Sequence, residues 1–225
     1  MRILLILVVW ISLLGCPSKS PNTLSNPAAE PSNRYAIHCD HFVSFFDTTE
    51  VINDKTVVTL DFKEDSLFFT ALVEENNIQY KFTQRDTTIW RDPCIEIFLD
   101  PGADGIDYYE MEFNAGGHLW DLKLKSNQPP INAAENMLPW QIDDTYKVEV
   151  EGTPNDSRDQ DRYWLISGRI SWDKIAEGRP QEGERWAYNF MRINYAQDGR
   201  ATYWVAKSTG QANIHYPSEW PVHVF

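Results

Sequence analysis

The strongest structural signal of the chain lies in residues 90–114, which read WRDPCIEIFLDPGADGIDYYEMEFN. Two runs rich in β-branched and aromatic residues, 94–99 and 108–113, flank a loop that contains Pro-Gly and Asp-Gly turn signals. Short apolar runs on either side of such turn residues are typical of paired antiparallel strands. The segment therefore predicts two strands on either side of a turn-rich loop, and a tryptophan, Trp90, precedes the first of them.

One carboxylate, Glu96, interrupts the first of these runs. Successive side chains of an extended strand point to opposite faces. Glu96 would thus share a face with Cys94 and Phe98, and the opposite face would carry the aliphatic residues Ile95, Ile97 and Leu99. A carboxylate in this setting either faces solvent or lines a polar site.

The rest of the chain predicts an all-β domain. Short strand-like segments recur with turns between them, and no amphipathic segment of helical period exceeds about two turns. The expected strands are 42–46, 56–63, 66–74, 78–83, 94–99, 108–114, 118–124, 145–151, 162–170, 185–194 and 201–206. Lys63-Glu64-Asp65-Ser66, between the apolar runs 57–62 and 67–73, predicts a hairpin. This pattern is typical of a single antiparallel β-sandwich of the jelly-roll or immunoglobulin-like kind, which we expect over residues 35–225.

The N-terminus has the pattern of an exported lipoprotein. Met1-Arg2 is followed by an apolar run at 3–14 and then by Gly15-Cys16. We expect residues 1–15 to be a signal peptide, Cys16 to be lipidated, and residues 16–34 to form a flexible Pro/Ser/Asn-rich tether. The alternative is a plain secretory signal with an accidental cysteine. The lipid would anchor the protein to the bacterial envelope, in the periplasm or at the outer membrane or cell surface.

Composition narrows the class of ligand. The chain has 20 Lys and Arg against 33 Asp and Glu, a formal charge of −13, which argues against nucleic acid as a partner. Nine Trp and ten Tyr supply many aromatic faces, on which the apolar face of a sugar ring can stack, although most of them must fill the core. If Cys16 is acylated, Cys39 and Cys94 remain either as a disulfide or as two buried free thiols.

Several motifs in order resemble the family 9 carbohydrate-binding module and its DOMON-like relatives. Besides Trp90 and Glu96, they are Gly117-His118-Leu119-Trp120-Asp121, Ile170-Ser171-Trp172, the strand 183–192 with Trp186, Asn189 and Arg192, Tyr203-Trp204, and His215-Tyr216-Pro217. The resemblance implies a sugar-binding β-sandwich without catalytic chemistry. Its oligosaccharide or polysaccharide would be held for a partner glycoside hydrolase or a glycan importer in carbohydrate catabolism.

The resemblance also implies the site. Trp90 and Trp204 would sandwich a sugar, and Glu96 would accept hydrogen bonds from its hydroxyl groups. Asn189 and Arg192 would add further hydrogen bonds, although a buried arginine that bridges strands is the commoner role for Arg192. Where family members carry an arginine after the Asp-Pro loop, this chain carries Glu110 and Glu112.

Three alternative chemistries accompany this interpretation. The loop carboxylates Asp100, Asp104 and Asp107 suit a structural calcium ion, and they are also ordinary turn formers. Glu96 with Glu110 or Glu112 offers the paired carboxylates of a glycoside hydrolase acting on O-glycosyl bonds. Met111 and His118 are the pair that would serve as axial ligands of a DOMON-like haem-binding electron-transfer module. Met111 shares a strand face with Tyr109 and Phe113, which favours a core position instead.

Overall fold

The computed structural model describes residues 34–50, 52, 54–125, 136–143, 145–195, 199–211 and 213–225. One compact unit spans Asn33–Phe225. The predicted signal peptide, Cys16 and all of the predicted tether except Arg34 lie outside the described residues. In the part of the chain described, no helix is both long and apolar enough to cross a membrane.

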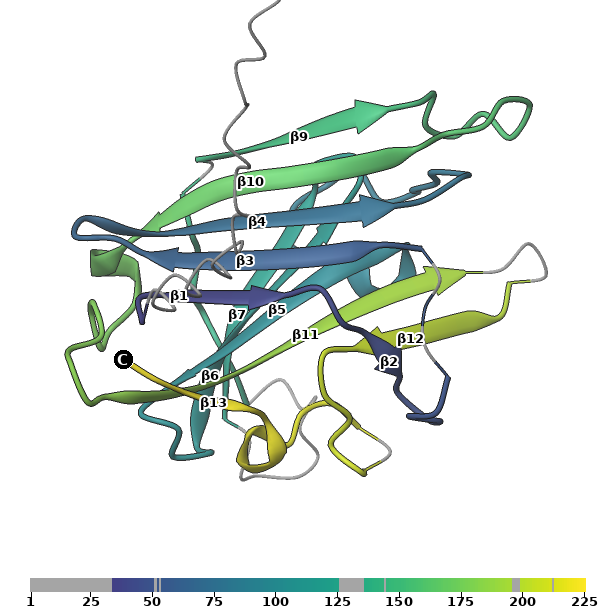
Figure 1. Cartoon of the computed structure of the whole chain (residues 1–225). Helices are drawn as coiled ribbons and strands as arrows, with labels where there is room; N and C mark the ends of the chain where they lie inside the picture. Colours follow the sequence, from purple (N-terminus) through teal and green to yellow (C-terminus); the bar gives the residue numbers. More distant parts are fainter. Residues whose placement is uncertain are drawn as a thin grey trace, which may run out of the picture. The chain divides into compact units, whose positions relative to one another are not determined.

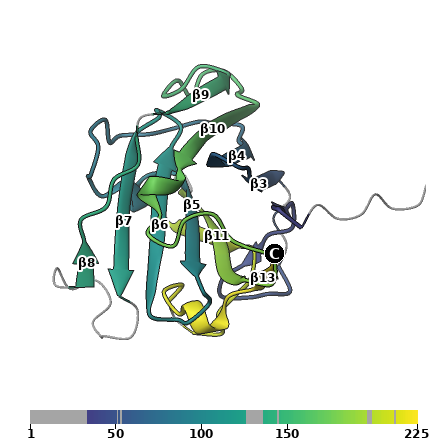
Figure 2. The same cartoon turned by 90° about the vertical axis from the view of Figure 1, so that its left-hand side faces the viewer.

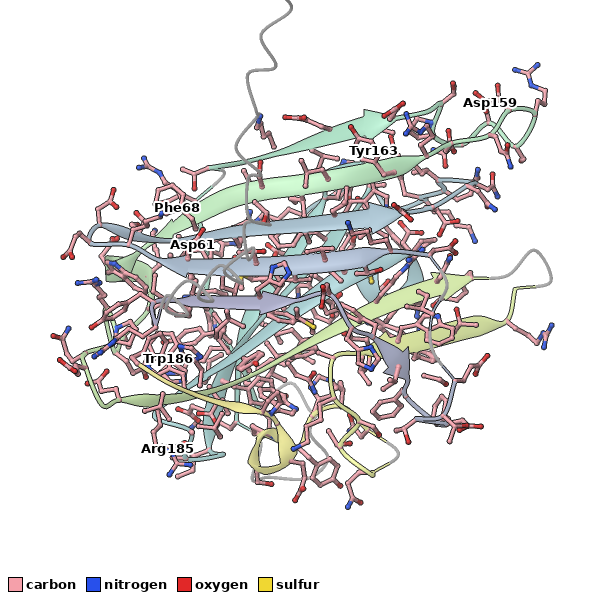
Figure 3. The ribbon with its side chains drawn as sticks, viewed as in Figure 1. Asp61, Phe68, Asp159, Tyr163, Arg185 and Trp186 are labelled. Atoms are coloured by element: carbon pink, nitrogen blue, oxygen red, sulfur yellow. The ribbon has the colours of Figure 1, made fainter. Side chains whose placement is uncertain are left out.

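The first of two antiparallel sheets has five strands, which lie side by side in Figure 1. In spatial order they are β1 (Ala36–Cys39), β3 (Thr56–Phe62), β4 (Ser66–Glu74), β10 (Tyr163–Ser171) and β9 (Tyr146–Glu151). The predicted hairpin between β3 and β4 is confirmed, since Lys63 N–H donates to the Ser66 carbonyl at 3.0 Å. In Figure 3, the labelled Asp61 and Phe68 mark opposed positions on these two strands.

The second sheet has eight strands and forms the other layer of the sandwich, which the side view of Figure 2 separates from the first. Its order is β2 (Val43–Ser44), β12 (Ala201–Val205), β11 (Arg185–Tyr195), β5 (Cys94–Pro101), β6 (Asp107–Asn114), β7 (Leu119–Lys125) and β8 (Met137–Leu138), with β13 (Val222–Val224) paired to β11. The described residues also include the short 3₁₀ turns η1 (Ile89–Arg91), η3 (Trp172–Lys174) and η4 (Pro217–Glu219).

The main core lies between the sheets and follows strand alternation. β3 contributes Val58, Leu60 and Phe62, and β5 contributes Ile95, Ile97 and Leu99. Trp186, labelled in Figure 3 near the start of β11, packs edge-on against Phe62 with ring centroids 5.5 Å apart. Each fully buried Val, Leu, Ile or Phe side chain of this core contributes about 1.5–3 kcal/mol to the free energy of unfolding. The predicted antiparallel β-sandwich is confirmed, as are the two predicted faces of 94–99.

The eight-stranded sheet is also covered on its outer face, the face turned away from the five-stranded sheet. Cys94 and Phe98 of β5 lie there in a second cluster with Tyr108, Met191 and Trp220. Every residue of β5 is therefore buried. This double burial places Glu96 and the neighbouring acidic residues of β6 away from bulk water.

The strand predicted at 78–83 is absent, because side chains take the place of a partner strand. The Asp161 carboxylate accepts the Ile78 N–H at 2.6 Å. Asp92 accepts the N–H groups of Lys81 at 2.9 Å and Phe82 at 2.8 Å. These carboxylates accept the hydrogen bonds that the backbone N–H groups would otherwise give to a neighbouring strand. The segment can therefore cross from one sheet to the other without strand pairing.

Arg192 bridges the two sheets, as its commoner role suggested. It is 1% exposed, and its guanidinium donates to the Thr56 hydroxyl at 3.0 Å, the Glu74 carbonyl at 2.8 Å and the Glu75 carboxylate at 2.9 Å. Thr56 begins β3, Glu74 ends β4 and Glu75 follows it, so one side chain of the larger sheet ties these adjacent strand ends to it.

The predicted disulfide does not form, and both cysteines are free. Cys39 ends β1 in the five-stranded sheet, where its thiol donates to the His41 carbonyl. Cys94 lies on the outer face of the other sheet. The sheet that carries Cys94 thus separates the two sulfur atoms, which leaves the second alternative, two thiols buried to different degrees.

We expect Arg192→Met to lower the free energy of unfolding by about 3–5 kcal/mol, because it removes the cation paired with the Glu75 carboxylate and the donor to the Thr56 hydroxyl and the Glu74 carbonyl. Urea denaturation measures this change. The matched control is Arg158→Met, which removes an exposed pair with Asp156 and should cost less than about 1 kcal/mol. Equal losses in the two variants would contradict a bridging role for Arg192.

Candidate functional site

A pocket of about 530 Å³ opens on the outer face of the eight-stranded sheet. Its walls are aromatic and its floor is acidic. The aromatic residues are Phe45, Phe46, Trp90, Trp120 and Tyr203, and the acidic ones are Glu96, Glu110 and Glu112. Asn213, Ile214 and His215, from the segment that precedes η4, close one side.

Strand register builds the floor of this pocket. Met191, Glu96, Glu112 and Trp120 stand opposite one another across β11, β5, β6 and β7, so they form one row on the same face. Glu110 lies in the next row, two residues along β6. Directly opposed residues and their diagonal neighbours are close enough to touch, so antiparallel pairing alone brings the three carboxyl groups together.

The carboxyl cluster, defined as Glu96, Glu110 and Glu112, is tight and buried. One oxygen from each residue lies within 4.8 Å of the others, and each residue is 3% exposed. Glu112 accepts the backbone N–H of Trp90 at 2.9 Å, and it is also hydrogen-bonded to Glu110. A hydrogen bond between two carboxyl groups requires a proton on one of them.

Burial raises the pKa of every member of the cluster, because removal from water penalises the charged form. The pKa of Glu110 rises to about 8. Mutual repulsion adds to the effect of burial on the pKa values of Glu96 and Glu112. At neutral pH the cluster therefore retains protons and carries less than its full negative charge.

His215 does not neutralise the cluster. Its Nδ1 lies 3.8 Å from a Glu110 oxygen, but burial lowers the pKa of the imidazole to about 4. The same nitrogen is 2.6 Å from the Tyr108 hydroxyl, which acts as its hydrogen-bond partner. His215 is thus uncharged at neutral pH, and no Lys or Arg side chain lines the pocket among the described residues.

Trp90 lies at the rim of the pocket, where its neighbours Arg91 and Asp92 fix its position. It lies in η1, is 37% exposed, and the Arg91 guanidinium covers its ring at 4.6 Å from the centroid. The fully buried Asp92 follows it and accepts hydrogen bonds from the 81–82 backbone and from Asn114. These contacts fix the turn that carries Trp90, while part of the indole side chain stays exposed at the pocket.

The structure brings together two of the five predicted sugar-site residues, Trp90 and Glu96. Trp204 packs against the core between the sheets, and Arg192 bridges the sheets. Asn189 is fully buried and ties itself to the Lys207 backbone at 2.8 Å. The prediction that these three line the same pocket as Trp90 is wrong. Strand pairing turns Trp204 and Arg192 to the inner face. Asn189 stands opposite Phe98 on the outer face, but its amide is bonded to the Lys207 backbone instead of lining the pocket.

Two aromatic residues take the expected place of Trp204. Tyr203 and Trp120 line the pocket, and neither was selected from the sequence. Because successive side chains of a strand point to opposite faces, Tyr203 and Trp204 must lie on different faces of β12. This rule does not tell which of the two residues points into the pocket. The pairing of Tyr203 with Ile193, which carries it to the outer face, supplies that information.

The predicted calcium ligands do not converge. The Asp100 carboxylate accepts the Gly105 N–H at 3.0 Å, Asp104 accepts the Ile106 N–H at 2.8 Å, and Asp107 lies 3.8 Å from the Lys123 amine. Each carboxylate thus serves its own turn or ion pair. Burial raises the pKa of Asp100 to about 7. These residues fit their alternative role as turn formers, and they do not fit a shared ion.

The haem alternative also lacks a common pocket. Met111 is fully buried between the sheets, as its strand face indicated. His118 lies in the β6–β7 turn with its ring near Asn114 and Tyr80. Axial ligands must point into one cavity, and these two side chains belong to different environments.

Comparison with known proteins identifies the family that the chain resembles. Residues 54–164 match the sequence model of carbohydrate-binding family 9, which confirms the predicted resemblance to that family. No curated protein sequence is significantly similar to the chain.

Two solved structures share the fold. One is a proposed carbohydrate-binding protein from Bacteroides uniformis, 18% identical, with a TM-score of 0.59 over 83% of this chain and 84% of that one. The other is a family 9 carbohydrate-binding module from Caldicellulosiruptor kristjanssonii in complex with glucose, 14% identical, with a TM-score of 0.50 over 76% of each chain. At these identities the likeness establishes the sandwich architecture.

The buried cluster makes stability depend on pH. The pKa of Glu110 is raised from 4.5 to about 8, so its stabilising contribution is complete below about pH 4.5 and is lost as the pH rises through 8. Glu110→Gln removes the ionisable group. We expect this variant to gain at least about 1.4 kcal/mol relative to the unmodified protein between pH 5 and pH 8.5, since one pKa unit is worth that much.

Urea denaturation at the two pH values measures this gain. The control is Glu219→Gln, which changes an exposed carboxylate at η4 and should shift stability equally at both. A Glu110→Gln difference that does not change with pH would show that Glu110 titrates normally.

Proposed function

We propose that this domain binds carbohydrate in the pocket of the eight-stranded sheet, without chemical conversion of the sugar. The observation that carries the proposal is the position of the partly exposed Trp90 ring at the rim of a pocket whose floor is the carboxyl cluster. Trp90 and all three members of the cluster lie within the segment that matches carbohydrate-binding family 9.

The geometry suits a sugar ring. One face of a pyranose is largely C–H and stacks on an aromatic surface, which Trp90, Trp120 and Tyr203 offer. Its hydroxyl groups both donate and accept hydrogen bonds. A cluster that contains both ionised and protonated carboxyl groups provides acceptors and donors for them. A pocket of about 530 Å³ is within the range of small-molecule sites.

Binding is favoured over glycoside hydrolysis by the arrangement of the acids. A glycosidase places one carboxyl group on each side of the scissile bond. Glu96, Glu110 and Glu112 stand in adjacent positions of two paired strands on one sheet face, so they approach a ligand from the same side.

In the cell, the proposal places this domain at the bacterial envelope. Cys16 carries the lipid, residues 16–34 act as the tether, and the domain holds an oligosaccharide or polysaccharide for a glycoside hydrolase or a glycan importer. The side of the membrane on which it acts is the periplasm or the cell surface.

Trp90→Ala should weaken binding ten- to hundredfold, because a buried aromatic anchor contributes on the order of 1–3 kcal/mol. A glycan array with the purified protein selects the ligand, and calorimetric titration measures the affinity. The matched control is Trp204→Phe, which alters a tryptophan on the core side of the sheet and should leave the affinity unchanged. Loss of binding in Trp204→Phe but not in Trp90→Ala would place the sugar elsewhere.

The anchor is tested by Cys16→Ser. This change removes the thiol that would be acylated, so the protein should move from the membrane fraction to the soluble fraction of expressing cells. Cys39→Ser is the control and should remain with the membrane. If Cys16→Ser still requires detergent for extraction, a different segment holds the protein at the membrane.

A further inference from the structure

The pocket contains several carboxyl groups but no positively charged side chain among the described residues that line it. Three carboxyl groups form its floor, and the described lining contains neither Lys nor Arg. His215, the one imidazole in that lining, is kept uncharged by burial, which lowers its pKa to about 4. Such a site attracts positive charge and repels anionic groups.

Glu96 is the member of the cluster that still lacks a strong donor. Glu112 receives the Trp90 N–H and shares a hydrogen bond with Glu110. Glu96 is 3% exposed and lines the pocket. Besides the carboxyl groups of Glu110 and Glu112, the hydrogen-bond donor that the described residues bring to it is the Cys94 thiol, at 4.0 Å. Thiols are weak donors, so a buried carboxyl group that faces the pocket is left with acceptor capacity for a ligand.

We propose that the ligand carries a protonated amino group, as an amino sugar does, and that this group inserts among Glu96, Glu110 and Glu112 while the sugar ring stacks on Trp90. The inference rests on the proposed carbohydrate-binding function and names the class of sugar that the same pocket prefers. The amino group donates hydrogen bonds, and each carboxyl group of the cluster accepts one.

The number of acceptors matches an ammonium group. An alkylammonium has three N–H donors, and the cluster offers three carboxyl groups whose oxygens lie within 4.8 Å of one another. Met191 and Trp120 flank Glu96 and Glu112 in their row, so the immediate surroundings along that row are apolar. Hydrogen bonds to charged groups are the stronger ones in such a setting.

A calcium ion fits less well. Calcium requires six to eight oxygen ligands. The cluster reaches six only if every carboxylate binds through both oxygens, and Glu112 already uses one oxygen for the Trp90 N–H. The aromatic walls add nothing to a calcium site, whereas the faces of Trp90, Trp120 and Tyr203 attract an organic cation.

The test compares matched sugars that differ by one group. The ligands are the methyl glycosides of glucosamine, galactosamine and mannosamine, each beside its neutral parent sugar and its N-acetyl derivative. Calorimetric titration of the full chain is run at about pH 6.5, where aliphatic amines are protonated. We expect at least one amino sugar to bind about tenfold or more tightly than both its neutral parent and its N-acetyl form.

Variants assign the preference to the cluster. Glu96→Gln preserves the shape and removes a carboxyl group that a bound ammonium would hold in its ionised form. It should therefore reduce affinity for the amino sugar about tenfold or more and change affinity for the neutral parent far less. The exposed Glu219→Gln variant should leave both affinities unchanged. Thermal melts beside each titration verify that the variants are folded.

The outcomes separate the two proposals. Neutral sugars that bind as tightly as their amino derivatives overturn the amine preference and leave carbohydrate binding intact. Sugar binding that requires added calcium and disappears with a chelator overturns it in favour of a metal-bridged site. Failure of every sugar, neutral or amino, including the oligosaccharides and polysaccharides of the array, overturns the proposed function and the inference with it.

Discussion

Three carboxyl groups buried side by side are the constraint on which the rest of this structure depends. Each would be far more favourable in water, and like charges at such distances oppose ionisation. Glu96, Glu110 and Glu112 nevertheless face one another because β5 and β6 pair in register at the centre of the larger sheet. Protons, a Trp90 N–H and a carboxyl–carboxyl hydrogen bond make the arrangement tolerable.

The surrounding structure leaves the cluster only 3% exposed, so its contact with water is limited to the pocket side. The outer face of the sheet is covered around the pocket by the segment that leads into η4, where the Trp220 indole donates to the Ile214 carbonyl at 2.8 Å. Trp220 also packs against Phe98, with ring centroids 5.3 Å apart. The inner face of the same strands forms the main core. Because both faces of the sheet are covered by packed side chains, the site has a low dielectric. The three carboxyl groups make the same site favour positively charged groups.

The frame that holds the site is made of side chains that satisfy backbone groups. Asp92 and Asp161 accept the N–H groups of a crossing segment that forms no strand, and Asp92 immediately follows the η1 turn that presents Trp90. Arg192 clamps the ends of β3 and β4 to the larger sheet. Residues that resemble site residues in the sequence therefore serve as supports, because a buried polar group must be paired wherever the fold places it.

The sequence by itself determined the all-β class, the β3–β4 hairpin, the strands β5 and β6, and the two faces of β5, because these follow from local alternation and turn residues. It also singled out Trp90 and Glu96, which do share the pocket. Only the tertiary structure decided that Tyr203 rather than Trp204 faces this pocket, that Cys39 and Cys94 lie apart, and that residues 78–83 form no strand. Alternation says which residues share a face, whereas the long-range strand register and the partners of buried polar groups decide where that face points.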